Sequence, residues 1–199
     1  FNIRFIITKN QKYIKEAIRT VESDLAKLDK RLPSNISTPL SSNYRPELDV
    51  SPTLDDDFTN WYQKLIGILR WAVELGRIDI HLSVALLAQY LVQPRAGHLD
   101  QVFHMFAYLK THSRSRIVLD DSKPLVDEQQ FVQVDWTDFY PDAQEPIPPN
   151  APAPRGNSVL LSCFVDADHA GNKLTRRSHT GIIIFCNRAP IIWFSKRQN

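Results

Sequence analysis

Hydrophobic residues recur along the first half of the chain at three- and four-residue steps, the spacing that places side chains on one face of a helix. This spacing predicts a first helix whose apolar face is formed by Ile14, Ile18, Val21, Leu25 and Leu28. It predicts three further helices over residues 60–75, 79–91 and 98–110. Ahead of the first helix, apolar and polar residues alternate over residues 1–7, which is typical of a half-buried strand, and residues 117–119 predict a second short strand.

The C-terminal part follows a different pattern, with apolar runs of strand length over residues 159–165, 181–185 and 190–194. Residues 186–189 join the last two runs, which are therefore predicted to pair as an antiparallel hairpin. Six prolines lie between Pro141 and Pro154, and so proline-dense a stretch holds neither a helix nor a central strand. The sequence predicts an α+β chain: helices, a proline-rich linker, and three strands of a sheet that is incomplete.

Shifts in composition divide the chain further. Residues 33–59 are rich in Pro, Ser and Asp without periodicity, which is typical of a surface connection. Asp55, Asp56 and Asp57 at its end are interpreted as capping residues, because carboxylates there accept bonds from the free amides of the next helix. The predicted segments are residues 1–32, 33–59, 60–119, 120–158 and 159–199.

The chain has 199 residues, of which 43% are hydrophobic, and this composition argues for a packed core and against wholesale disorder. The sequence has two cysteines, and it shows neither a secretory signal nor a membrane-spanning apolar stretch. These features predict an intracellular protein of the cytoplasm or nucleus without a membrane partner. The first residue is Phe1 rather than Met, which predicts a piece of a longer protein.

Charge is unevenly distributed, although the net charge is only +2. Residues 1–31 hold 8 Lys and Arg against 4 Asp and Glu, residues 155–199 hold 7 against 2, and the middle of the chain is acidic. Basic ends suit contact with nucleic-acid phosphates, because bound Lys and Arg release condensed counterions. Ordinary surface charge explains the same pattern, so both interpretations stay open.

The apolar run over residues 159–165 ends directly in Asp166 and, one residue later, Asp168. Two such carboxylates point to the same face if the strand continues, and carboxylate oxygens are ligands that Mg²⁺ prefers. A solvated turn at the end of a strand is the alternative. Zinc is disfavoured, because no common short zinc-binding spacing is matched by Cys163, His169, His179 and Cys186.

Several motifs in the right order resemble the Pol polyproteins of copia-type retrotransposons. Residues 166–171 (DADHAG), 176–181 (RRSHTG) and 192–198 (IWFSKRQ) are similar to the opening of their ribonuclease H domain. Residues 62–79 and 94–110 look like the C-terminal region of their reverse transcriptase, and the first helix looks like the thumb-side start of that region. The sequence departs from the family pattern at His169, where a Trp is usual, and at His179, where a small hydroxyl residue is usual.

The resemblance implies the end of a palm and a thumb helix over residues 1–32, a helical reverse-transcriptase region over 60–119, and the truncated start of a ribonuclease H-like domain over 159–199. The parent enzyme would copy RNA into DNA and cleave the RNA of RNA–DNA hybrids by two-metal hydrolysis with Mg²⁺. Asp166 would be a catalytic carboxylate, and Asp166 and Asp168 would bind metal. Both active sites are expected to be incomplete in this chain.

The chain by itself is therefore expected to act as a non-catalytic nucleic-acid-binding fragment, and a decayed transposon relic is the remaining alternative. Its expected partners are an RNA–DNA hybrid or template-primer and the remainder of the Pol polyprotein. Phosphate contacts are expected from Lys9, Lys12, Lys15, Arg19, Arg176, Arg177, Lys196 and Arg197.

Overall fold

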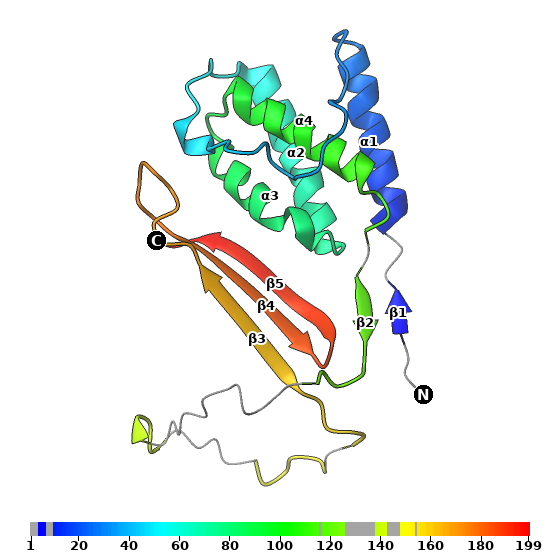
Figure 1. Cartoon of the computed structure of the whole chain (residues 1–199), viewed down its shortest axis with the longest axis vertical. Coiled ribbons are helices and arrows are strands. Elements are labelled where there is room, and N and C mark those ends of the chain that lie inside the picture. Colours follow the sequence, from blue (N-terminus) through cyan, green and yellow to red (C-terminus); the bar gives the residue numbers. More distant parts are fainter. Residues whose placement is uncertain (1–3, 7–9, 116, 126–137, 143–147, 154) are drawn as a thin grey trace.

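The computed structural model describes residues 4–6, 10–115, 117–125, 138–142, 148–153 and 155–199. A layer of helices lies against a three-stranded sheet (Figure 1). The helices are α1 (Asn10–Ala26), α2 (Asp56–Glu74), α3 (His81–Leu87) and α4 (Ala96–Thr111), with short 3-10 turns η1 (Pro46–Leu48), η2 (Ile78–Ile80) and η3 (Ala88–Tyr90). The strands are β1 (Arg4–Ile6), β2 (Val118–Asp120), β3 (Leu161–Ala167), β4 (His179–Cys186) and β5 (Ala189–Arg197).

All strand pairs are antiparallel, β1 with β2 and β4 between β3 and β5. The hairpin turn between β4 and β5 contains Asn187, whose φ of 55° lies in the left-handed region that Asn tolerates. The Asn187 side chain accepts the Leu160 amide (2.8 Å) and donates to the Asp121 carbonyl (2.7 Å). The predicted α+β class and antiparallel hairpin are confirmed.

The expected helices are present, with two differences in their limits. α2 begins at Asp56, earlier than predicted, because the Asp55 carboxylate caps it by accepting the Phe58 amide at 2.9 Å. The segment expected as one helix over residues 79–91 is divided into η2, α3 and η3. The Tyr62 hydroxyl donates to the Leu87 carbonyl at 2.7 Å, which satisfies a backbone acceptor at the point where α3 ends.

Two predicted segments lie partly outside the described residues. The linker prediction over residues 120–158 includes 126–137, 143–147 and 154, and the first strand prediction includes 1–3 and 7, none of which is described. The described parts of 121–158 contain no α-helix or β-strand. In the described ranges, no helix combines the length and the apolar character that crossing a membrane requires.

The hydrophobic core lies within the helical layer, where Val21, Leu69, Leu87 and Phe106 bring together one buried side chain from each of the four helices. α3 packs on β5, and Trp193 of β5 contacts this core. β3 lies at an edge of the sheet, and its Phe164 and Val165 side chains are 59% and 65% exposed. The sheet is therefore anchored through β5.

The connection between α1 and α2 is attached to the start of α4. The Asp49 carboxylate accepts bonds from the Tyr44 hydroxyl (2.5 Å) and the Ser51 amide (2.8 Å). The Ser51 hydroxyl accepts the Gly97 amide at 2.8 Å, and a Cβ atom at Gly97 would overlap the Asp49 carboxylate. Burial alone would raise the pKa of Asp49, but the hydrogen bonds from Ser51 and Tyr44 outweigh burial and lower it.

His98 joins the same connection to α4 from inside the protein. Its side chain is 1% exposed, Nδ1 accepts the Arg95 amide at 3.0 Å, and Nε2 lies 3.0 Å from the Pro46 carbonyl. Nδ1 accepts a bond, so Nε2 carries the proton and donates to Pro46. The ring also stacks on Tyr90, with centroids 4.1 Å apart. Both ring nitrogens are therefore satisfied by backbone atoms.

A second buried polar group connects η2 to α4. The Arg77 side chain is 1% exposed and binds both carboxylate oxygens of Asp79, at 2.9 and 2.7 Å. The Tyr108 hydroxyl of α4 donates to the same carboxylate at 3.1 Å. Burial alone would raise the pKa of Asp79, but Arg77 outweighs it and lowers the pKa. The carboxylate is thus held ionised beside a buried guanidinium.

Candidate nucleic-acid interface

One face of the three-stranded sheet carries the polar residues singled out in the sequence. Asp166 of β3 pairs with Gly181 of β4, which pairs with Ser195 of β5. His179 of β4 pairs with Arg197 of β5. Directly paired residues share a face, and so do residues two apart along a strand. All five positions therefore lie on the same side of the sheet.

Trp193 fixes the direction of this face, because it lies two residues before Ser195 and packs against the helical core. The face therefore points toward α3, and two cavities lie between them. One, of about 750 Å³, lies between η2–α3 and the strands and is lined by Asp166 and Asp168. The other, of about 500 Å³, lies between α2–α3 and the end of β5. His81, His179 and Trp193 line both.

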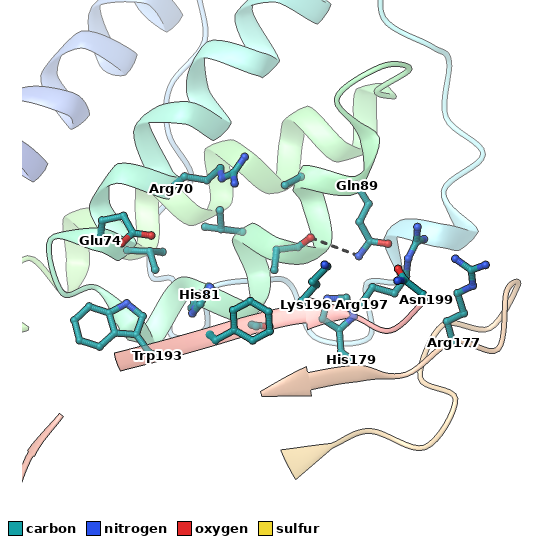
Figure 2. A pocket seen from close by; sticks show the side chains of 16 residues that line it. Arg70, Glu74, His81, Gln89, Arg177, His179, Trp193, Lys196, Arg197 and Asn199 are labelled. Carbon is teal, nitrogen blue, oxygen red and sulfur yellow. Dashed lines mark hydrogen bonds between the residues drawn. The ribbon is translucent and has the colours of Figure 1, made fainter. Parts of the chain in front are cut away.

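The smaller cavity, here called the basic cleft, gathers cationic side chains from three parts of the chain (Figure 2). The acidic residue that lines it, Glu74, lies near Trp193 and away from the end where Arg177 and Arg197 lie. In the part of the chain that the structure describes, these cations form no ion pair. The cleft thus has a net positive charge, because Glu74 is outnumbered by its cations. Its cations are Arg70 of α2, Arg177 of the β3–β4 loop, and Lys196 and Arg197 of β5.

His179 is a buried polar side chain between the two cavities. It is 7% exposed, and its Nε2 is buried without a hydrogen-bond partner. Burial lowers the pKa of His179 below its usual 6.5, the Asp168 charge opposes this, and the Arg197 charge reinforces it. The ring is therefore neutral near pH 7 and has an unused ring nitrogen.

The two aspartates of the predicted metal site have different surroundings. Asp166 lies exposed near the end of β3. The Asp168 carboxylate instead accepts the His179 backbone amide and is folded over its own loop, where a Cβ at Gly171 would overlap it. Both aspartates are exposed, but one Asp168 oxygen is already bonded within the β3–β4 loop.

The described residues do not by themselves fit Mg²⁺. Among them, no three His, Cys, Asp or Glu side chains gather closely enough to hold a metal ion. Mg²⁺ takes an octahedral set of oxygen ligands, whereas Asp166 and Asp168 supply at most two carboxylates, one of them already bonded to the His179 amide. We assign no reaction step to a metal, and the metal-binding roles of Asp166 and Asp168 stay predictions.

The residues expected to bind nucleic acid fall into two separate groups. Lys12, Lys15 and Arg19 are exposed on α1, which packs on α2 and α4 rather than beside β5. A second group lies at the basic cleft and includes Arg177, Lys196 and Arg197. Arg176 is exposed on the β3–β4 loop and does not line the cleft, and Lys9 lies outside the described residues.

Sequence reasoning missed Arg70 and did not assign His179 to the interface. Arg70 interrupts the apolar pattern of α2, a position that is ordinary for a solvent-facing cation. No local signal connects Arg70 with β5, because the two meet only through the packing of the helices on the sheet. His179 had one usable signal, since it replaces a small hydroxyl residue in the family pattern.

Acidification is expected to destabilise the fold before its carboxylates titrate. Burial lowers the pKa values of His81, His98 and His179 below 6.5. The unfolded chain therefore binds more protons than the folded one as the pH falls below 6.5. The stabilisation that the neutral histidines contribute is fully present above about pH 6.5 and is lost as the pH falls toward their lowered pKa values. Urea unfolding at pH 8, 7, 6 and 5 measures the effect. A free energy of unfolding that stays constant or rises toward pH 5 contradicts it.

Comparison with known proteins finds that the chain is similar to transposon proteins. It is 27% identical over 188 residues to a protein of Saccharomyces cerevisiae described as belonging to transposon Ty5-1, covering 94% of this chain and 47% of that protein. It is 24% identical over 163 residues to the retrovirus-related Pol polyprotein from transposon RE1 of Arabidopsis thaliana, covering 82% of this chain and 9% of the polyprotein. The corresponding polyprotein from transposon TNT 1-94 of Nicotiana tabacum is 22% identical over 182 residues, covering 89% and 11%.

The chain is thus similar over most of its length to copia-type transposon Pol polyproteins, and the resemblance seen in the motifs is confirmed. It spans less than half the length of the Ty5-1 protein and about a tenth of the two plant polyproteins. No protein-family model matches the chain, and no solved structure matches it.

Proposed function

We propose that this relative of retrotransposon Pol polyproteins joins the end of a reverse transcriptase to the start of a ribonuclease H-like domain, and that its residues bind the backbone of an RNA–DNA hybrid or template-primer. The observation that carries the proposal is the basic cleft, where cations from the helical layer and from the sheet converge without ion-pair partners among the described residues. Phosphate contacts supply sequence-independent affinity and position a duplex without reading it, which suits an enzyme that acts on any template.

The exposed cations of α1 supply a second contact in this proposal. Lys12, Lys15 and Arg19 recur at helical spacing, so they form one stripe along the helix. The only ion pair found for this stripe among the described residues is a long one, 4.0 Å between Lys12 and Glu16, and such an exposed pair contributes little. The stripe is thus free to follow the phosphates of a template-primer.

Asp166 belongs to the hydrolytic part of the proposal. We propose that it is one carboxylate of a Mg²⁺ site whose other ligands come from residues beyond those described. Bound Mg²⁺ would supply activation of water and stabilisation of the leaving oxygen. Asp166 is exposed on the sheet face that adjoins the basic cleft, so nucleic acid held in the cleft would lie along the strands that carry this carboxylate.

Reversing the charge of the α1 stripe is expected to weaken hybrid binding. The triple variant Lys12→Glu, Lys15→Glu, Arg19→Glu should lose about tenfold or more in affinity for a 20-base-pair RNA–DNA hybrid at low salt, because three phosphate contacts become repulsive. Fluorescence anisotropy with an end-labelled hybrid measures the change.

A matched control changes the same amount of charge at three exposed positions elsewhere: Arg45→Glu, Arg155→Glu, Arg188→Glu. This variant should lose clearly less affinity than the α1 variant. Equal losses would mean that hybrid binding follows net charge alone, and undetectable binding by the unsubstituted chain would overturn the proposed function.

A further inference from the structure

We infer that the basic cleft is a seat for phosphate groups of a nucleic-acid strand, with Arg70 of α2 on its helical side and the pair Arg177 and Arg197 on its sheet side. The inference deepens the proposed function, because it names a site that bridges the helical layer and the sheet, and it adds Arg70 and His179 to the binding residues. Figure 2 shows Arg70 on the helical side of the cleft and Arg177 and Arg197 toward its other end.

The charges of the cleft favour an anion over any other ligand. Three guanidinium groups and the Lys196 ammonium line it, against the single carboxylate of Glu74. Arginine presents paired N–H donors that match the oxygens of a phosphate. Because these donors have no ion-pair partner among the described residues, an incoming phosphate does not have to displace an existing bond.

His179 adds a second kind of hydrogen-bond donor to the cleft. A buried polar atom is normally hydrogen-bonded, and leaving one unpaired costs free energy. The His179 Nε2 atom is buried without a partner, and the residue lines the cleft opposite Arg197 in the strand register. An N–H on this nitrogen would have a phosphate oxygen as its acceptor.

The seat lies between the helical layer and the sheet. Arg70 belongs to the helical layer, whereas Arg177, Lys196 and Arg197 belong to the sheet and its loop. These two parts meet mainly through α3 and β5. A strand whose phosphates bind on both sides of the cleft would hold the two parts together, so that binding by the reverse-transcriptase region also positions the sheet.

The test compares two substitutions on the same helix. Arg70→Gln removes one cation from the cleft, and Lys64→Gln removes an exposed cation of α2 that does not line it. Arg70→Gln is expected to weaken binding of a 20-base-pair RNA–DNA hybrid about fivefold and to reduce the salt dependence by about one phosphate contact. Lys64→Gln is expected to leave affinity nearly unchanged, and equal affinities for the two variants would overturn the inference.

Titration with inorganic pyrophosphate, followed by calorimetry, separates this inference from the proposed function. Pyrophosphate binding that is lost in both Arg70→Gln and His179→Phe supports a phosphate seat, and wild-type chain that binds no pyrophosphate counts against it. Hybrid binding that is unaffected by Arg70→Gln overturns the seat but leaves the proposed function standing. Pyrophosphate binding without hybrid binding overturns nucleic acid as the source of the phosphate, together with the proposed function.

Discussion

Replacing His98 by Ala is expected to lower the free energy of unfolding by about 3 kcal/mol. The substitution removes a ring that is 1% exposed and stacked on Tyr90. It also leaves the Arg95 amide without its partner and removes one of the two hydrogen bonds to the Pro46 carbonyl. The lost packing and the lost hydrogen bonds both destabilise the junction between the α1–α2 connection and α4. Urea denaturation followed by circular dichroism at pH 7.5 measures the loss.

His104 on the same helix provides the matched control. It is less buried than His98, and its ring nitrogens lie 2.9 Å from the Thr38 carbonyl and 3.3 Å from the Ser41 hydroxyl. Water can replace these partners, so His104→Ala should cost about 1 kcal/mol. A His98→Ala variant no less stable than His104→Ala would show that the buried junction does not stabilise the fold.

Replacing Asp79 by Ala is expected to cost about 3 kcal/mol, because it leaves the buried Arg77 guanidinium without its carboxylate. Arg77 is 1% exposed and makes two hydrogen bonds to Asp79, so water reaches the charge poorly after the substitution. Asp100→Ala, at an exposed position of α4, should change stability by less than about 0.5 kcal/mol. Thermal and urea unfolding of both variants provide the comparison.

A double variant distinguishes a lost ion pair from lost packing. Arg77→Met combined with Asp79→Ala removes both charges, so it should be more stable than Asp79→Ala alone. A double variant that is less stable than the single one would mean that Arg77 contributes mainly through the packing of its side chain.

The sequence pattern predicted the helices and strands well, because their apolar positions pack into shared contacts. The faces of α1, α2 and α4 meet in one core, and Asp55 caps α2 as its position before the apolar pattern suggested. The division of residues 79–91 could not be read from periodicity, since it accompanies a hydrogen bond from Tyr62, which lies 25 residues before Leu87.

The candidate site was only partly predictable, for a similar reason. Arg177 and Arg197 stood out as basic residues beside strands, but their meeting with Arg70 depends on α3 packing against β5. The spacing of Asp166 and Asp168 suggested two equivalent carboxylates. Local hydrogen bonding distinguishes them, because both are exposed but Asp168 also accepts the His179 amide. Sequence spacing does not reveal which of two aspartates will accept a backbone hydrogen bond.

The central claim is that this chain binds nucleic acid through its phosphates, and the salt dependence of hybrid binding tests it most directly. Dissociation constants for a 20-base-pair RNA–DNA hybrid would be measured between 50 and 200 mM KCl, a range over which binding through phosphate contacts weakens strongly. Several phosphate contacts predict that log Kobs falls linearly with log[KCl], with a slope of about −3 or steeper. A slope near zero, or no binding at the lowest salt, would contradict the account.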